Sequence, residues 1–570
     1  MATQSQVIKG RVRFFFILVV FFGLGLIYRL YTVQIVSGEE FSVKADRQYL
    51  MPSSTLLNRG AIYFTTKDGE RVTAAYQQTG NIVFINPSMI ADPEPIYERI
   101  NSAVPIDKED FLKKAAKRTD PYEEIVKKVD LAVGEKIKEP ALSGLYVKKQ
   151  KWRTYSFNRL AANVLGFMAF DRDDLAGRYG LERQYEKTLK RANESMYANF
   201  FVDMFSNIKG TFSDDESREG DIVTTIEPTV EDFLERTLEQ VTKKWNSGHT
   251  GGIIMNPANG EIIAMGTNPS FDPNNFSNES DSKIFSNRLV EDVYEMGSII
   301  KPLTLAAGID SGVIAPESTY FDAGFLVLNN RRIANYDGRG RGIVNMQQVL
   351  SQSLNTGAAY VAGKLGNGNF SRYMKSFGLD KKTGIDLPFE AAPLVENLNS
   401  GREIEHATAS YGQGIALTPV ATVRALSILA NRGNLVEPHV VSRIDFKTGL
   451  SKSIEIKPPF QVLKPETAEK VTRMLVQVVD EALLEGKVKM ERYSIAAKTG
   501  TAQISDGKGY YEDRYLHSFF GYFPAYNPKF IIFLYTYYPK EVRYASETLT
   551  HSFMDIAKYL INYYDVPPDR

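Results

Sequence analysis

The sequence predicts a mixed α/β fold of the α+β kind, in which an antiparallel sheet is covered by helices. Residues 252–255 and 261–265 are apolar runs on either side of an Asn-Gly turn, the pattern of a β-hairpin. Three more apolar runs lie near the end of the chain, at 494–497, 518–523 and 530–537. Helical patterns separate the two sets, at 302–310 and 345–352. A sheet that takes strands from both ends of its domain is a layered structure and not a doubly wound parallel one.

An apolar segment near the N-terminus predicts a transmembrane helix that anchors the chain. Lys9, Arg11 and Arg13 precede an uncharged run at 14–28, and a mostly apolar stretch continues to residue 36. A bilayer needs about 20 apolar residues, and arginines at the ends of the run can extend it by snorkelling. A cleaved signal peptide is the alternative, but no small-residue cleavage site follows the run. The basic residues place the N-terminus in the cytoplasm and the rest of the chain outside the membrane.

Charge and cysteine content exclude several classes of function. The 68 lysines and arginines balance 68 aspartates and glutamates, so the formal net charge is zero and nothing favours binding to nucleic acid. Without cysteine there is no disulfide, no thiolate nucleophile and no cysteine-ligated zinc. None of the five histidines stands in a metal-ligand or triad pattern. Cysteine and histidine therefore offer no recognisable metal site or catalytic triad.

Changes of pattern divide the chain into three parts. Residues 1–36 are the short cytoplasmic tail and anchor, 37–245 an elongated, mixed and loop-rich module, and 246–570 the domain with the predicted sheet. Within the middle module the Lys/Glu-rich stretch 122–139 predicts a solvated helix. We find no catalytic constellation in this module.

A serine and a lysine one helical turn apart predict the reactive centre. A serine needs a neighbouring base to act as a nucleophile, and a lysine whose pKa is lowered by burial and nearby positive charge can be that base. Ser298 and Lys301 stand at positions i and i+3, which places the amine beside the hydroxyl on a helix. Gly297 precedes them and an apolar run at 303–307 follows, as in a buried helix whose N-terminal N–H groups can hold an oxyanion.

Neither this spacing nor a Lys-Thr-Gly triplet is selective by itself. The S-x-x-K spacing also occurs in polar surroundings, at Ser206/Lys209, Ser280/Lys283 and Ser505/Lys508. Lys-Thr-Gly occurs at 382–384, 447–449 and 498–500. The first triplet lies in a loop-like stretch and the second between two short strand-like runs, so both are interpreted as turns. The third is flanked by apolar strands.

Order and context complete the predicted site. Ser353 and Asn355 follow a short helix that Asn345 can cap, with a glutamine three residues later completing a capping box. A loop at that place can aim both side chains into a cleft. Lys498 opens a strand that can pair with a peptide substrate by β-addition, and Gly500 would let that substrate approach closely.

The three motifs together resemble a known family. Ser298-x-x-Lys301, Ser353-x-Asn355 and Lys498-Thr-Gly500 are similar to the signatures of the penicillin-binding proteins and serine β-lactamases. Further segments resemble the class B branch, the monofunctional D,D-transpeptidases: 58–60, 153–155, 160–167, 180–185, 411–414 and 518–524. The chain departs from the family pattern after Gly60 and at Ser156, where proline is usual. The resemblance covers nearly the whole chain and leans towards the septal, division-type enzymes.

The resemblance implies a serine acyl-enzyme mechanism. Ser298 would attack the carbonyl before the terminal D-alanine of a stem peptide, and Lys301 would take its proton. Ser353 would relay a proton to the leaving amine, with Lys498 tuning that group electrostatically. An amine from a second stem peptide would resolve the acyl-enzyme, whereas β-lactams would trap it.

It also implies residues that bind the substrate. Asn355 would hold the substrate amide, and Thr499, Gly500 and Thr501 would form the strand that receives the substrate carboxylate. The backbone N–H groups of Ser298 and Thr501 would form the oxyanion hole. No metal or cofactor takes part.

Partners and alternatives follow from the same resemblance. We expect a single-pass protein of the bacterial cytoplasmic membrane that acts outside it on lipid-linked peptidoglycan precursor, beside a membrane glycosyltransferase and other division or elongation proteins. A D,D-carboxypeptidase or β-lactamase shares the signatures and uses water as the acceptor. A penicillin-sensing receptor and a non-enzymatic scaffold are further alternatives. The short cytoplasmic tail argues against the receptor, and the intact Ser298/Lys301 pair argues against the scaffold.

Overall fold

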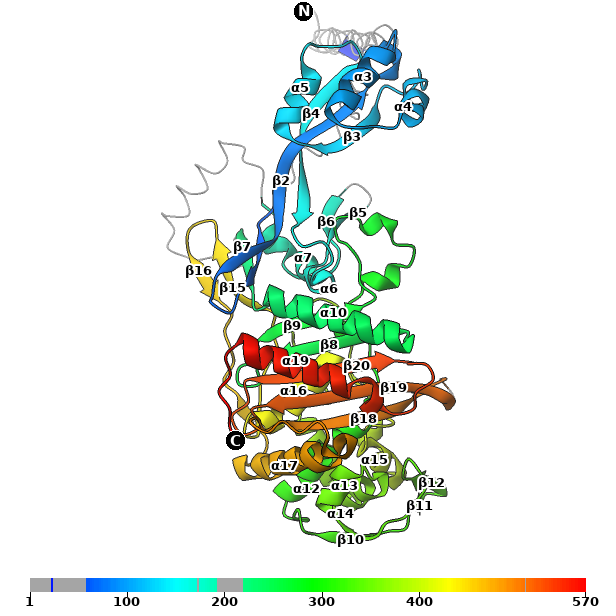
Figure 1. The fold of residues 1–570 in the computed structure, drawn as a ribbon, viewed down its shortest axis with the longest axis vertical. Coiled ribbons are helices and arrows are strands. Elements are labelled where there is room, and N and C mark those ends of the chain that lie inside the picture. The colour runs from blue at the N-terminus through cyan, green and yellow to red at the C-terminus, as the bar shows by residue number, and fades with distance from the viewer. Residues whose placement is uncertain (1–21, 24–57, 172–173, 192–218, 508) are drawn as a thin grey trace, which may run out of the picture. The chain divides into compact units, whose positions relative to one another are not determined.

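The computed structural model describes residues 22–23, 58–171, 174–191, 219–507 and 509–570 (Figure 1). The predicted anchor therefore lies outside the described residues except for Phe22 and Gly23, and none of the helices described is long and apolar enough to cross a membrane. The described chain forms two compact units. One contains residues 77–152, and the other contains residues 59–76 and those from 153 onwards.

The smaller unit has its own apolar core, which includes Val83, Ile100 and Phe111. In this unit β2 (Arg71–Ile85) pairs with β3 (Glu123–Val129) and β4 (Leu145–Tyr155). Three helices pack around the strands: α3 (Glu94–Ala103), α4 (Lys108–Ala115) and α5 (Leu131–Lys138).

The prediction of a solvated helix over 122–139 is wrong for its first half. Residues 123–129 form strand β3, and only 131–138 are helical. Val129 is buried, and Ile125 and Val126 pack against the same core. Pairing with β2 and these apolar contacts outweigh the helix preference of the lysines and glutamates, because strand formation depends on context more than on propensity.

The larger unit is built on a five-stranded antiparallel sheet in the order β18-β19-β20-β8-β9. Its strands are β8 (His249–Met255), β9 (Ile262–Asn268), β18 (Ala496–Ser505), β19 (Tyr510–Phe523) and β20 (Phe530–Tyr537). The predicted hairpin is β8–β9, and the three predicted C-terminal strands are present. The sheet combines both ends of its domain as expected, and β18 lies at one edge.

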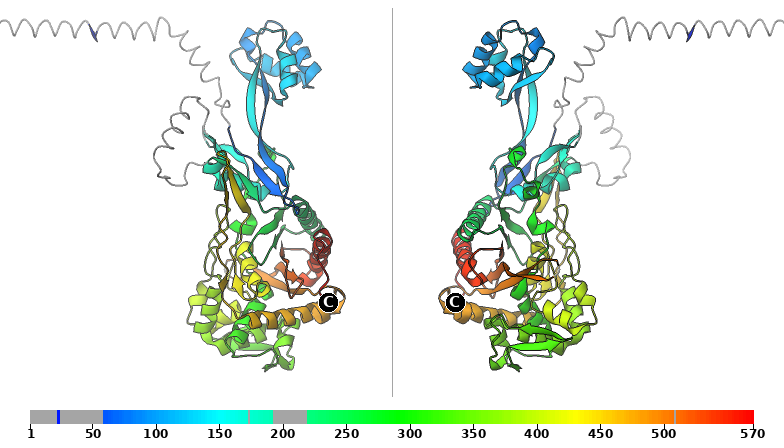
Figure 2. Two further views of the ribbon diagram at one scale, coloured as in Figure 1. Left: turned by 90° about the vertical axis from the view of Figure 1, so that its left-hand side faces the viewer. Right: turned by 90° about the vertical axis from the view of Figure 1, so that its right-hand side faces the viewer.

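Helices cover both faces of this sheet. On one face α10 (Pro228–Trp245) and α19 (Thr550–Tyr563) lie side by side (Figures 1 and 2), and the rings of Phe233 and Tyr559 stack with centroids 4.0 Å apart. On the other face lie α12 (Lys301–Asp310), α16 (Pro419–Ala430) and α17 (Pro465–Gln477). The neighbours Phe519 and Phe520 are both fully buried, one in each layer. Burial on both faces is why these strands are continuous apolar runs instead of alternating ones.

Further elements surround the helical layer. Two ribbons follow α12 in the chain, β10 (Thr319–Asp322) with β13 (Gly342–Asn345) and β11 (Phe325–Leu328) with β12 (Arg331–Ala334). After them come helices α13 (Met346–Ser351), α14 (Asn355–Ser376) and α15 (Glu403–Ala409). Four further strands pair with their neighbours in the spatial order β16-β15-β7-β1. They are β1 (Ile62–Thr65), β7 (Gly220–Thr224), β15 (Val441–Phe446) and β16 (Ser451–Ser453). The remaining short helices include α7 (Gly180–Gln184), α11 (Arg288–Glu291) and α18 (Ala545–Thr548).

Three of the family-like segments meet at one buried carboxylate. Glu182 is fully buried in α7, where its Oε2 lies 2.5 Å from Arg59 Nε and its Oε1 lies 2.6 Å from Arg153 Nε. Arg153 Nη1 also donates to the carbonyl oxygen of Gly60 at 2.7 Å. The segments 58–60, 153–155 and 180–185 are thus joined by a buried ion triad that no local pattern reveals.

Two carboxyl groups share a buried environment between α10 and its neighbours. Glu231 Oε2 accepts from the backbone N–H of Met265 at 2.7 Å, and Glu235 Oε1 accepts from that of Ala161 at 2.9 Å. The two carboxyl groups are close enough for each to affect the pKa of the other. Burial raises the pKa of Glu231 to about 7, and burial with the neighbouring charge raises the pKa of Glu235 well above its usual range.

This pair predicts a stability that declines as the pH rises. A carboxyl whose pKa is raised by folding binds more protons in the folded state, so its contribution is complete below the unfolded pKa of about 4.5 and is lost as the pH passes through about 7. Glu231→Gln, which cannot ionise, should therefore gain stability relative to the wild type between pH 5 and 8. Urea unfolding of both proteins across that range measures the difference. A difference that does not change with pH would contradict the raised pKa of Glu231.

Candidate active site

Ser298 lies in a tight turn at the start of a buried helix. The turn is a 3-10 helix, η7 (Gly297–Ile300), that continues into α12, and Pro302 occupies the first turn of α12 as predicted. Gly297 has a φ of 65°, which favours glycine, and its N–H donates to the Gly412 carbonyl at 3.0 Å. A Cβ on Gly297 would stand 2.9 Å from the carbonyl oxygen of Thr501, so the turn presses closely against β18.

Lys301 points its amine at two serines. Its Nζ lies 2.9 Å from Ser298 Oγ, 3.1 Å from Ser353 Oγ and 2.6 Å from the Ser353 carbonyl oxygen. The residue is fully buried. Burial, with a smaller contribution from the charge of Lys498, lowers the pKa of Lys301 well below its ordinary value. A lysine amine whose neutral form is favoured in this way, and that contacts a serine hydroxyl, can remove the proton of that hydroxyl.

Ser353 sits in the turn between α13 and α14. The capping box predicted at Asn345 is present at the start of α13, with both of its hydrogen bonds to Gln348. Ser353 has a φ of 53°, in the left-handed region, and Asn355 is the first residue of α14. Asn355 Nδ2 donates to the carbonyl oxygen of Ala334 at 2.9 Å.

Lys498 reaches the same serine from the edge strand. Its side chain is buried, and Nζ lies 3.1 Å from Ser353 Oγ and 3.0 Å from the Thr499 carbonyl oxygen. Burial lowers the pKa of Lys498 to about 8. The structure therefore brings Ser298, Lys301, Ser353 and Lys498 into one continuous set of contacts.

The residues after Lys498 continue along β18. Thr499 and Thr501 are partly exposed, and Thr501 Oγ1 accepts from the Ala545 N–H at 3.2 Å. Gly500 is buried, and a Cβ there would stand 2.7 Å from the Met296 carbonyl oxygen. The structure thus provides a packing reason for this glycine, because any side chain would push the edge strand away from the turn that carries Ser298.

The other copies of the motifs have structural surroundings. At 382–384 the backbone N–H groups of Thr383 and Gly384 donate to Glu390, and 447–449 is the turn between β15 and β16, as predicted. Ser280 and Lys283 are exposed and lie near a short 3-10 turn. Residues 206, 209 and 508 lie outside the described residues.

The sequence analysis missed Glu295, three residues before Ser298. Its carboxylate accepts from the Gly414 N–H at 3.0 Å and from the Tyr510 hydroxyl, at 3.0 Å to each oxygen. Glu295 thereby links the Ser298 turn to the 411–414 loop and to the β18–β19 hairpin. A single acidic residue in a turn belongs to no sequence pattern from which such long-range partners could be predicted.

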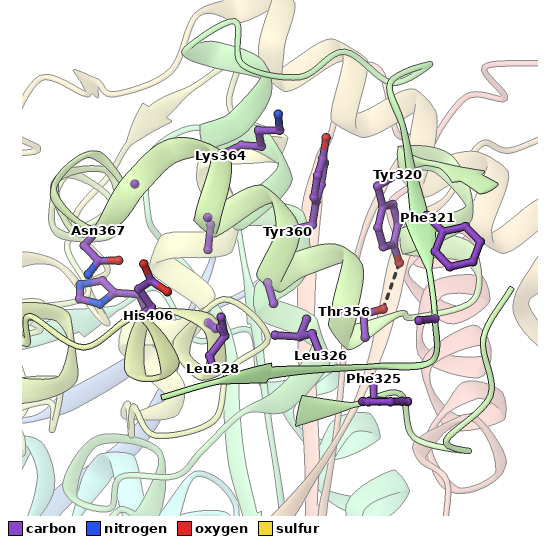
Figure 3. Close-up of a pocket in the computed structure, with 17 residues that line it drawn as sticks. Tyr320, Phe321, Phe325, Leu326, Leu328, Thr356, Tyr360, Lys364, Asn367 and His406 are labelled. Carbon is purple, nitrogen blue, oxygen red and sulfur yellow. Dashed lines mark hydrogen bonds between the residues drawn. The ribbon is translucent and has the colours of Figure 1, made fainter. Parts of the chain in front are cut away.

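A cavity of about 730 Å³ lies beside α14 (Figure 3). Aromatic side chains, including Tyr320, Phe325 and Tyr360, form part of its wall, and Ser298 and Lys301 are not among the lining residues. Across the described part of the chain, no group of three or more His, Cys, Asp or Glu residues is arranged to hold a metal ion.

Fold and site together are those of a serine acyl-transfer enzyme whose serine lies beside a buried lysine amine. Comparison with known proteins agrees. Residues 250–557 match the family model described as the penicillin-binding protein transpeptidase domain, and residues 55–225 match the penicillin-binding protein dimerisation domain. The chain therefore belongs to the class B penicillin-binding proteins.

Named relatives and solved structures cover most of the chain. Stage V sporulation protein D of Bacillus subtilis is 29% identical over 556 residues, which span 95% of this chain and 83% of that protein. The peptidoglycan D,D-transpeptidase MrdA of Acinetobacter baumannii is 27% identical, over 93% of this chain and 84% of that protein. The crystal structure of penicillin-binding protein 3 of Mycobacterium tuberculosis, complexed with aztreonam, superposes with a TM-score of 0.67 at 21% identity, covering 90% and 97% of the two chains.

Proposed function

We propose that this protein cross-links peptidoglycan as a D,D-transpeptidase and is acylated by β-lactams. The observation that carries the proposal is the fully buried Lys301 amine in contact with the hydroxyls of Ser298 and Ser353. A buried ammonium without a carboxylate partner is costly, so this arrangement favours the neutral base.

In the proposed reaction Ser298 Oγ attacks the carbonyl carbon before the terminal D-alanine. Its proton passes to Lys301 Nζ, and the negative charge that develops on the carbonyl oxygen is held by the backbone N–H groups of Ser298 and Thr501. The C–N bond then breaks, and the leaving amine takes a proton through Ser353. Lys498, within 3.1 Å of Ser353 Oγ, supports that transfer electrostatically. The amine of a second stem peptide attacks the ester and releases Ser298.

The edge position of β18 supports the proposed mode of substrate binding. A peptide can pair with the open side of β18, its carboxylate beside Thr499 and Thr501 and its backbone passing Gly500. Asn355 stands on the opposite wall of the site, where it would hold the substrate amide. In the structure its amide donates to Ala334, so it would rotate or share that hydrogen bond when substrate binds.

We further propose the membrane topology and partners that the sequence predicts. Residues 1–36 would be the cytoplasmic tail and anchor, 37–245 the module that connects the anchor to the enzyme, and 246–570 the transpeptidase domain. A membrane glycosyltransferase would supply the glycan strands that carry the stem peptides. The basic residues before the apolar run support this topology, and the name of the relative MrdA, a peptidoglycan D,D-transpeptidase, supports a place in cell-wall synthesis.

A peptide exchange assay tests the function. The full-length protein is given a stem peptide ending in D-alanyl-D-alanine together with a D-amino acid as acceptor. We expect D-alanine release accompanied by the exchanged peptide. Hydrolysed peptide without exchange would identify a carboxypeptidase instead, and no turnover together with no penicillin acylation would refute the acyl-enzyme.

Three lysine variants test the placement of the third motif. Lys498→Ala should slow acylation by penicillin by about 30- to 1,000-fold, equivalent to about 2–4 kcal/mol, because it removes a preorganised charge beside Ser353. Lys382→Ala and Lys447→Ala are the matched controls, since both lysines are exposed and each begins another copy of the Lys-Thr-Gly triplet. The second-order acylation rate of all three is compared with the wild type. A slow Lys382→Ala or Lys447→Ala beside a normal Lys498→Ala would show that the wrong strand was assigned.

A further inference from the structure

The turn that carries Ser353 needs support from outside its own segment. Ser353 adopts a left-handed backbone conformation, which is unfavourable for residues other than glycine. Leu354 stands at the N-cap of α14, and its side chain cannot accept a hydrogen bond. The first N–H groups of a helix need acceptors when they are buried, and Thr356 in that first turn is buried. Another part of the chain must therefore cap α14.

Asn335, which follows strand β12, provides this cap. Its Oδ1 accepts from the Thr356 N–H at 3.3 Å and lies 3.0 Å from Thr356 Oγ1. The preceding residue contributes as well, because the Ala334 carbonyl accepts from Asn355 Nδ2 at 2.9 Å. Both contacts fall within three residues of Ser353.

Asp322, at the end of β10, fixes the orientation of that amide. Its carboxylate is buried and accepts from Asn335 Nδ2 at 3.1 and 3.0 Å and from Thr356 Oγ1 at 2.8 Å. The backbone N–H groups of Gly324 and Arg341 also donate to it, at 2.9 and 3.2 Å. Because a carboxylate only accepts, it holds Nδ2 towards itself and leaves Oδ1 for α14.

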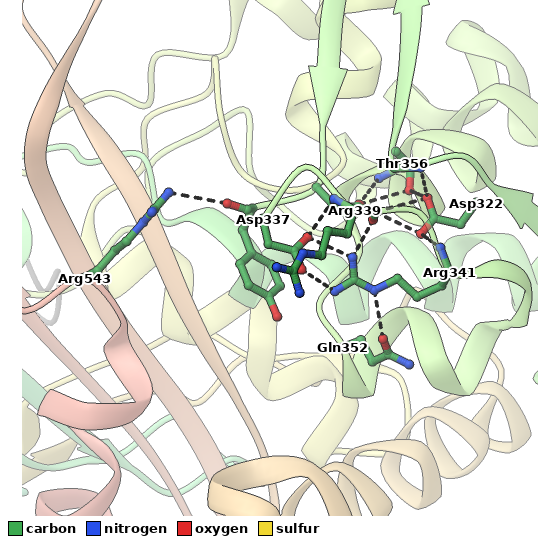
Figure 4. A network of polar contacts seen from close by, with 10 residues as sticks. Asp322, Asp337, Arg339, Arg341, Gln352, Thr356 and Arg543 are labelled. Atoms are coloured by element: carbon green, nitrogen blue, oxygen red, sulfur yellow. Dashed lines mark hydrogen bonds and ion pairs between the residues drawn. The ribbon is translucent and has the colours of Figure 1, made fainter.

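The same network reaches the other side of the turn (Figure 4). Arg341 Nε donates to Gln352 Oε1 at 3.1 Å, and Gln352 directly precedes Ser353. Asp337 holds the Arg341 guanidinium through two hydrogen bonds of 2.8 Å. Arg341 thus holds the turn at Gln352, before Ser353, and Asn335 holds it at Thr356, after Ser353. Asp322 contacts both Arg341 and Asn335.

We infer that Asp322 and Asn335 are positioning residues that hold the Ser353 turn against Lys301 and Lys498. The inference rests on the proposed function of Ser353. Both lysine amines reach its oxygen atoms at 2.6–3.1 Å, so a small displacement of the turn breaks the contacts on which proton transfer depends. Neither positioning residue contacts Ser298 itself.

The test uses the two groups that face each other, the amide of Asn335 and the carboxylate of Asp322. Asn335→Asp sets two carboxylates against each other in a buried place, so the rate constant of covalent acylation by penicillin should fall at least about tenfold, the effect of losing one charge-assisted hydrogen bond. The dissociation constant of the non-covalent complex should stay within about threefold, because the network lies behind the turn. Adding Asp322→Asn restores a donor opposite the new carboxylate, and the double variant should recover to within about fivefold of the wild type.

If the double variant recovers the acylation rate, the loss in Asn335→Asp comes from a displaced turn and not from a general loss of stability. Glu390→Gln is the matched control, since Glu390 is a buried carboxylate that accepts from two backbone N–H groups in the same domain, at 382–384. It should lower the melting temperature and leave the covalent step unchanged. Should Asn335→Asp not fold, Asn335→Ala removes the cap without adding charge and should also slow the covalent step.

A wild-type covalent rate in the folded Asn335 variant would overturn the inference, and so would an equal loss in Glu390→Gln. A double variant no faster than Asn335→Asp would overturn it as well. Failure of the wild type itself to be acylated would count against the proposed function instead, so the two failures are distinguishable.

Discussion

Ser298→Ala should abolish covalent labelling by a fluorescent penicillin while leaving the protein folded. The hydroxyl of Ser298 is 2.9 Å from the Lys301 amine, and its removal leaves no oxygen at that place to form the ester. The side chain is small and next to a buried helix, so we expect a stability change of no more than about 1 kcal/mol. Labelling is followed on a denaturing gel, and folding by thermal unfolding of the same sample.

The other serines with the same spacing provide the control. Ser280→Ala and Ser505→Ala keep Ser298 and should label like the wild type, because neither serine opens a buried helix. Labelling of Ser298→Ala at the wild-type rate would show that another residue is the nucleophile. Loss of labelling in Ser280→Ala or Ser505→Ala alone would have the same consequence.

Glu182→Ala should destabilise the larger unit by about 3–5 kcal/mol, the usual effect of breaking a buried ion pair from one side. The carboxylate contacts two buried guanidinium groups, and its removal leaves Arg59 and Arg153 without their shared partner in a place that water does not reach. The pKa of Glu182 is lowered because the two arginines outweigh the opposing effect of burial. Urea unfolding at pH 7 measures the loss.

Two further variants define the cause of that effect. Glu182→Gln keeps the size and one acceptor oxygen but loses the charge and the second acceptor, so it should fall between the wild type and Glu182→Ala. Glu405→Ala removes a carboxylate from the exposed pair with Arg402 and should change stability by no more than about 0.5 kcal/mol. If Glu182→Ala were as mild as Glu405→Ala, the triad would not be a source of stability.

The local parts of this structure could be predicted from the sequence. The hairpin at 252–265, the capping box at Asn345 and the i, i+3 placement of Ser298 and Lys301 depend on neighbours within a few positions, and the structure contains all three. The choice among three Lys-Thr-Gly triplets also needed only context, because an apolar run on both sides distinguishes an edge strand of the core from a turn. The helix expected over 122–139 shows the limit, since its strand exists through pairing with a distant one.

Only the tertiary structure decided the contacts between segments that are far apart in the chain. Sequence spacing cannot show that Arg59, Arg153 and Glu182 share one buried site, or that Gly500 is required by the Met296 carbonyl behind it. Burial is a property of the assembled core, and burial lowers the pKa of Lys301, as its proposed role as a base requires. The sequence by itself determined which residues could react, and the packing of distant elements determined the distances and the dielectric environment in which they do so.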